Sequence, residues 1–193
     1  MSQLKRSDLM SLEQYSNERT AFRSRVLEHK KNRKLHLGPN FTLLFEDRLT
    51  IQYQIQEMLR IEKIFDSAGI EEELSAYNPL IPNGSNLKAT LLIEYADIEQ
   101  RKIELARLAN IERAIYSQVE GFDAKSTIAD EDLDRSNSEK TSAVHFLRFE
   151  FSSAEILALK TGSNLIFGIN DERMPVAITV DESIKQCLLA DFS

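Results

Sequence analysis

The chain has 193 residues, of which 42% are hydrophobic and 28% charged, enough for one domain with a full core. This composition excludes a mainly disordered chain, and no apolar stretch approaches the roughly 20 residues that span a bilayer, so we expect no membrane contact. The single cysteine, Cys187, excludes an internal disulfide and a cysteine-based zinc site, and we expect a reducing, cytoplasmic compartment.

Positive charge is concentrated near the N-terminus of a chain whose net charge is −7. Residues 1–48 hold 10 Lys and Arg against 6 Asp and Glu, whereas residues 49–193 hold 14 against 25. Because the acidic remainder would repel phosphate, we expect no nucleic-acid partner. The basic residues of 19–34 are then expected to dock against the acidic part or to remain solvated.

The N-terminal half predicts helices with one strand among them. A helical segment is expected over residues 7–34, followed by a strand at Phe41–Phe45. A helix is predicted from Arg48 to Ile64. The next helix is capped by Asp66 or Ser67 and runs to Tyr77.

The C-terminal half predicts a mixture of strands and short helices. Strands are expected at Leu87–Tyr95, Arg113–Val119 and Ala143–Phe151, and we expect all three in one sheet. Residues 121–142 are polar and acidic, and we expect them to form the most mobile internal segment. The whole pattern favours a single α+β domain over residues 1–193, with a mostly antiparallel sheet and flanking helices.

No common catalytic or cofactor motif is present in the sequence. GxxxxGK[ST], GxGxxG, HExxH and GxSxG are all missing, so we expect no bound cofactor and no metal. The three histidines lie on separate predicted elements. His145 alternates with Leu147 and Phe149 on an apolar strand, which favours a structural role, and Cys187 is interpreted as a small buried apolar residue.

A stripe of polar side chains follows the predicted helix that begins at Arg48. At about 100° per residue, Glu46, Thr50, Tyr53, Glu57 and Arg60 share one arc of the helix or its lead-in. Such a stripe can bind a polar ligand or perform acid–base chemistry when partly buried, although a solvated face would show the same spacing. The candidate polar site consists of Glu46, Asp47, Arg48, Tyr53, Gln54, Glu57, Arg60 and Glu62.

Two residues of the stripe carry a sharper expectation. Glu62 falls within the apolar arc, where a carboxylate must be paired or neutral unless the helix end frays. Arg60 is expected to be mostly buried and paired with Glu46, Glu57 or Glu62.

Three blocks of the sequence carry a resemblance to a known family. They are LGPNFTLLFEDRLTIQYQIQEMLRIEKIF, YNPLIPNGSNLKATLLIEY and SAVHFLRFEF. Over essentially the whole chain, the sequence resembles an uncharacterised bacterial family of a domain of unknown function. The family pattern coincides with the candidate polar site and adds Gln56. Members tend to be encoded near rubrerythrin-like and iron–sulfur oxidoreductase proteins, which implies a role beside a redox system.

Three functions stay open, and the sequence decides neither whether the protein is an enzyme nor its oligomeric state. The leading hypothesis is a non-enzymatic accessory protein that binds a rubrerythrin-like or iron–sulfur partner through residues 46–62. The alternative is a small enzyme or ligand-binding protein with a polar pocket lined by Glu46, Tyr53, Glu57 and Arg60. The third is a carboxylate site for Mg, Mn or iron, formed by Glu46, Asp47, Glu57 and Glu62.

Overall fold

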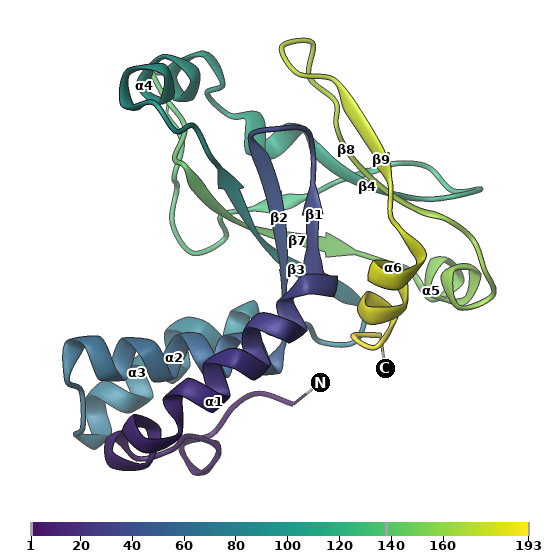
Figure 1. The fold of residues 1–193 in the computed structure, drawn as a ribbon. Coiled ribbons are helices and arrows are strands. Elements are labelled where there is room, and N and C mark those ends of the chain that lie inside the picture. The colour runs from purple at the N-terminus through teal and green to yellow at the C-terminus, as the bar shows by residue number, and fades with distance from the viewer. Residues whose placement is uncertain (1, 138, 193) are drawn as a thin grey trace.

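A layer of helices lies at one end of two antiparallel sheets in the computed structural model, which describes residues 2–137 and 139–192 (Figure 1). The layer consists of α1 (Leu12–Lys30), α2 (Arg48–Glu62) and α3 (Ser67–Tyr77). Three shorter helices follow, α4 (Ile98–Arg107), α5 (Ser153–Lys160) and α6 (Glu182–Leu189). Single 3-10 turns are η1 (Arg6–Asp8), η2 (Lys31–Arg33), η3 (Asn78–Leu80) and η4 (Ile111–Ala114).

The described strands form two sheets in which every pairing is antiparallel. The first has the order β1 (Lys34–His36), β2 (Phe41–Glu46), β3 (Asn86–Ile93), β7 (Val144–Glu150), β6 (Ile128–Ala129). The second has the order β5 (Lys125–Ser126), β4 (Ile115–Val119), β8 (Leu165–Ile169), β9 (Val176–Thr179). The expected α+β fold with antiparallel sheets and flanking helices is confirmed.

The main core lies between the inner faces of the two sheets. Because side chains alternate along a strand, each sheet turns one apolar row inward. Phe167 of the second sheet meets Phe45 and Phe149 of the first, with ring centroids 5.1 and 4.9 Å apart. His145 and Leu147 lie in the same buried row of β7 as Phe149, as their alternation predicts.

One prediction about the sheets is wrong. The segment Arg113–Val119 does not join the sheet of β3 and β7: its first two residues belong to η4, and the rest is β4 of the second sheet. Alternation marks a half-buried strand but carries no information on which distant strand pairs with it. Here β4 pairs with β8, and Ile115 lies opposite Ile169.

Residues 121–142 contain more regular structure than their composition indicates. They include β5 and β6, and the side chains of Thr127 and Thr141 are buried. The Thr127 amide donates to the Ile115 carbonyl at 2.8 Å. The segment is thus attached to both sheets at defined points, and its expected mobility stays a prediction.

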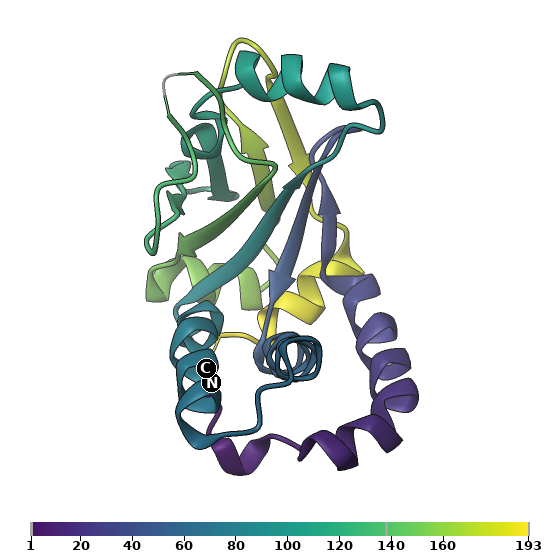
Figure 2. The same cartoon turned by 90° about the vertical axis from the view of Figure 1, so that its left-hand side faces the viewer.

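The helical layer has its own apolar contacts. Figure 2 looks along α2, with α3 on one side and α1 on the other. Ile51, Ile55 and Leu59 of α2 pack against Leu74 of α3. The helix α2 begins at Arg48 as expected, with Asp47 accepting from the Leu49 and Thr50 amides, and α3 has the expected cap Asp66, which accepts from the Gly69 amide. No helix within the described residues is long and apolar enough to cross a membrane.

A buried arginine attaches this layer to the sheets. The Arg33 side chain is 2% exposed, and its guanidinium donates to the carbonyls of Phe45 and Glu46 at 3.0 and 3.1 Å. It also forms an ion pair with Asp191 and lies 3.5 Å from the Asp47 carboxylate. At this point the basic N-terminal segment docks against acidic groups, one of the two outcomes expected from its charge.

Substituting Arg33 should destabilise the whole fold. Arg33→Met leaves the buried Asp191 carboxylate and two carbonyls without their donors, and we expect the free energy of unfolding to fall by about 3–5 kcal/mol. Denaturant unfolding measures this change. Arg23→Met, at an exposed position of α1, is the matched control and should cost under about 1 kcal/mol. A loss under about 1 kcal/mol for Arg33→Met would contradict this assignment.

Candidate functional site

The residues of the candidate polar site lie in separate internal networks. Glu46 accepts from the hydroxyls of Thr50 and Thr90 at 2.5 and 2.7 Å. Asp47 caps α2 and pairs with His29. Burial opposes ionisation of Asp47, but Arg33, the Thr50 amide and His29 together lower its pKa. Both carboxylates therefore fix the start of α2.

Glu57 is the centre of a second network, which joins α2 to α1. Its carboxylate accepts two bonds from Arg19 at 2.7 and 2.8 Å and one from the Tyr15 hydroxyl at 2.7 Å. Hydrogen bonds from Arg19, followed by those from Tyr15 and Arg60, lower the pKa of Glu57 to about 2. The partners come from another helix, so this contact holds two helices together.

The remaining stripe residues lie at or near the surface. Arg48 pairs with Asp8 at 2.8 Å, and the Tyr53 ring packs against Phe22. The side chains of Gln54 and Glu62 are exposed.

The expected burial of Arg60 is wrong, because its side chain is 40% exposed, while its pairing with Glu57 at 3.2 Å is confirmed. Glu62 is likewise not held in an apolar environment. The physical reason is that the neighbouring helices cover α2 only as far as Leu59, and the last turn, including Ile61, extends into solvent.

The four carboxylates of the predicted metal site do not form one cluster. Glu46 and Asp47 lie at the start of α2, Glu57 binds Arg19 of α1, and Glu62 is exposed at the end of α2. A different cluster, Glu112, Asp130 and His145, has ligand-type atoms within 4.8 Å of one another. His145 Nδ1 lies 2.6 Å from Asp130, and the Thr141 hydroxyl bridges His145 Nε2 at 2.8 Å and Glu112 at 3.1 Å. A metal ion would have to displace this hydroxyl. The cluster therefore forms a closed hydrogen-bond network that attaches Asp130 and Thr141 to His145 of β7.

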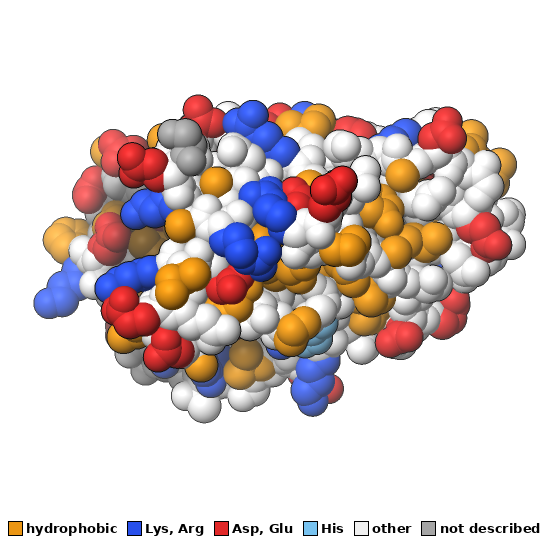
Figure 3. Space-filling model, turned by 90° about the horizontal axis from the view of Figure 1, so that it is seen from above, with side chains coloured by type: hydrophobic (Ala, Val, Ile, Leu, Met, Phe, Trp, Pro, Cys, Tyr) orange, Lys and Arg blue, Asp and Glu red, His pale blue; other side chains and the backbone are white. Residues whose placement is uncertain are grey.

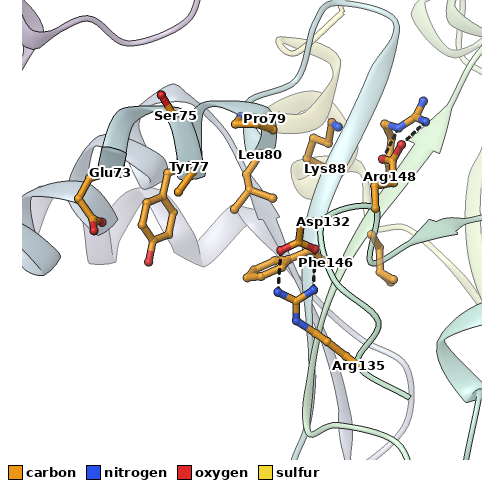
Figure 4. A pocket seen from close by; sticks show the side chains of 13 residues that line it. Glu73, Ser75, Tyr77, Pro79, Leu80, Lys88, Asp132, Arg135, Phe146 and Arg148 are labelled. Atoms are coloured by element: carbon orange, nitrogen blue, oxygen red, sulfur yellow. Dashed lines mark hydrogen bonds and ion pairs between the residues drawn. The ribbon is translucent and has the colours of Figure 1, made fainter. Parts of the chain in front are cut away.

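A cavity of about 580 Å³ lies between α3 and the outer face of the β3–β7 pair (Figure 4). This volume is within the range of small-molecule sites. Pro79 lies in the 3-10 turn η3 that follows α3, and both Pro79 and Leu80 line the cavity. The lining side chains include Glu73, Tyr77, Pro79, Leu80, Lys88, Asp132, Arg135, Phe146 and Arg148. We call this cavity the α3–sheet pocket.

Strand alternation places the sheet residues of the pocket. Leu87 and Ala89 face the core, so Lys88 between them points outward, and the same holds for Arg148 between Leu147 and Phe149. Lys88 and Arg148 lie directly opposite each other in the antiparallel register.

The two arginines of the pocket are already neutralised. Arg148 donates twice to Glu131, both at 2.7 Å, and also pairs with Glu150. Arg135 pairs with Asp132 at 2.6 and 2.8 Å and lies over the Phe146 ring, 4.7 Å from its centroid. These pairs shape the wall and leave little net charge on it.

Two charged groups of the pocket have no hydrogen-bond or ion-pair partner within residues 2–137 and 139–192. One is the ammonium of Lys88, a half-buried residue. Burial lowers the pKa of Lys88 and Arg148 adds to this, while Glu131 and Glu150 act in the opposite direction. The other is the Glu73 Oε2 atom, which is buried, and burial together with Glu62 and Glu72 raises the pKa of Glu73. Figure 4 shows Glu73 and Lys88 well apart, with Tyr77 and Leu80 between them.

On the face seen in Figure 3, basic and acidic side chains are interspersed with hydrophobic ones. Single apolar residues such as Ile98 and Ile103 of α4 are exposed. Isolated exposed residues of this kind are ordinary for a protein surface.

The pocket residues could not be identified from the sequence. They come from α3, η3, β3, β7 and the 130–135 segment, so no local spacing brings them together. One signal was available. Lys88 and Arg148 each stand between two apolar residues of a strand, and both lie in blocks that carry the family resemblance.

These features define an α+β protein with a ligand-sized pocket and no common cofactor motif. The chain belongs to the family described as "Protein of unknown function (DUF3501)", which matches residues 3–192. It is similar to the crystal structure of a novel protein of unknown function from Burkholderia pseudomallei K96243, with 48% identity, a TM-score of 0.95 and coverage of 100% of both chains. No curated protein matches the chain. The resemblance to an uncharacterised bacterial family is confirmed.

The Glu57 network should make the stability of the fold depend on pH in the acidic range. Because folding lowers the pKa of Glu57 from 4.5 to about 2, its contribution is fully present above pH 4.5 and is lost as the pH falls toward 2. We expect the unfolding free energy of the wild type to fall more steeply over this window than that of Glu57→Gln. Glu62→Gln, on the exposed end of α2, should keep the wild-type slope. Equal slopes for the wild type and Glu57→Gln would refute the network's contribution.

Proposed function

We propose that this protein is a binding protein whose α3–sheet pocket holds a small organic ligand with an apolar body and an anionic head group. The observation that carries the proposal is Lys88, a half-buried cation without a partner among the described residues, on the wall of a cavity of about 580 Å³. An unpaired cation on a partly buried wall attracts an anionic group, so such a group beside Lys88 would be stabilising.

The remaining lining supports an apolar ligand body. Tyr77, Leu80 and Phe146 present ring and aliphatic surface, while the nearby arginines are occupied by their own carboxylates. A pocket with apolar walls and a few unpaired polar groups is typical of small-molecule sites. The proposal keeps the ligand-binding alternative of the sequence analysis but assigns it to other residues.

Octanoate is a suitable probe, because it combines a carboxylate with a flexible apolar chain. Calorimetric titration should detect binding to the wild type, and Lys88→Met should weaken it at least about tenfold, or about 1.4 kcal/mol. The matched control is Lys102→Met, at an exposed position of α4 where Lys102 pairs with Glu99. Equal affinity of the wild type and Lys88→Met, or no binding to either, would contradict the proposal.

A second function is supported by a different observation. Ile61 and Phe65, at the end of α2 and just beyond it, are 60% and 77% exposed. Aromatic side chains such as Phe65 are enriched in protein–protein interfaces. We propose that the end of the 46–62 segment docks the rubrerythrin-like or iron–sulfur protein that the family resemblance implies. The cytoplasmic location and the absence of a nucleic-acid partner stay predictions.

Binding of such a redox partner can be measured with purified proteins. Immobilised wild-type protein should retain a rubrerythrin-like or iron–sulfur protein encoded beside it. An Ile61→Ser, Phe65→Ser double variant should retain less, because the apolar contact is lost. Lys102→Met again serves as the control. Equal retention by all three proteins would rule out this surface.

A further inference from the structure

Lys88 lies on the central strand of the first sheet, which has a neighbouring strand on each side. Its strand, β3, lies between β2 and β7, and its side chain leaves the outer face toward the α3–sheet pocket. Backbone hydrogen bonds to both neighbouring strands hold the main chain at Lys88, so the point from which its side chain extends is fixed. Its amino group is then presented to the cavity and not to bulk solvent alone.

The carboxylates around Lys88 are each bound to other groups. Glu131 accepts two bonds from Arg148, and Glu150 accepts from Arg148 and from the Asn86 amide at 3.0 Å. The Lys88 ammonium forms no hydrogen bond or ion pair with any residue that the structure describes. No carboxylate among the described residues therefore forms an ion pair that would stabilise the charged form of the Lys88 amine.

The strand neighbour on the other side does not neutralise Lys88 either. Glu46 of β2 lies opposite Lys88, but its carboxylate accepts from the hydroxyls of Thr50 and Thr90. Arg148, opposite Lys88 on β7, is a like charge. Partial burial in a cavity with apolar walls favours the neutral, nucleophilic form of a lysine amine.

We propose that Lys88 is a nucleophilic amine that forms an imine with a carbonyl-containing ligand in the α3–sheet pocket. This inference rests on the proposed function, because it requires that the pocket bind a small molecule. The nitrogen lone pair attacks the carbonyl carbon and forms a C–N bond, giving a carbinolamine. One amine proton passes to the carbonyl oxygen, and the resulting hydroxyl leaves with the remaining N–H proton as one water molecule, which forms the C=N bond. No oxidant or reductant takes part.

Octanal is the probe for this step, because it shares its chain with octanoate and carries an aldehyde. The full chain is incubated with octanal and sodium cyanoborohydride, which reduces any imine to a stable amine, and labelled lysines are identified by peptide mass spectrometry. We expect labelling of Lys88 at least about tenfold faster than that of the exposed Lys102, a difference of about 1.4 kcal/mol in barrier. Octanoate should suppress labelling at Lys88 and leave Lys102 unchanged.

Lys88→Arg is the matched variant, since it keeps the positive charge and removes the nucleophilic amine. It should lose the fast label, keep the slow labelling of Lys102 and still bind octanoate. Octanoate binding to the wild type without faster labelling of Lys88 would overturn the imine and leave the proposed function standing. Absence of both octanoate binding and selective labelling would overturn both.

Discussion

The desolvated guanidinium of Arg33 is the constraint on which the arrangement of the layers depends. A buried charge is tolerated only when its partners are held in good geometry. Here the partners are the carbonyls of Phe45 and Glu46 and the carboxylate of Asp191, from β2 and from the end of the chain. With these groups fixed, β2 continues directly into α2, and α3 is placed beside the outer face of the first sheet. The α3–sheet pocket is the space that remains between them.

Much of the secondary structure could be predicted because its signals are local. Asp47, Asp66 and Ser152 cap the helices that follow them through bonds to amides two or three residues away. Sheet membership could not be predicted in the same way. The pairing of β4 with β8 joins residues about fifty positions apart, and only the packed core selects it.

The candidate polar site illustrates a related limit. Periodicity placed Glu57 and Arg60 on one arc of α2, and their pairing followed. It could not reveal that Arg19 and Tyr15 of α1 bind the same carboxylate, because that contact depends on how two helices pack. The pocket was still harder to predict from the sequence, since Tyr77, Lys88 and Phe146 come from three elements. What the sequence did contain was a lysine and an arginine, each between two apolar residues of a strand.

The central claim is that the stripe on α2 stabilises the architecture, whereas the α3–sheet pocket binds the ligand. Amide chemical-shift mapping during titration with octanoate separates these roles most directly. The account predicts shifts concentrated at residues that line the pocket, including Tyr77, Lys88 and Phe146, with the amides of Glu46 and Glu57 unchanged. Shifts concentrated along residues 46–62, with none around the pocket, would contradict it.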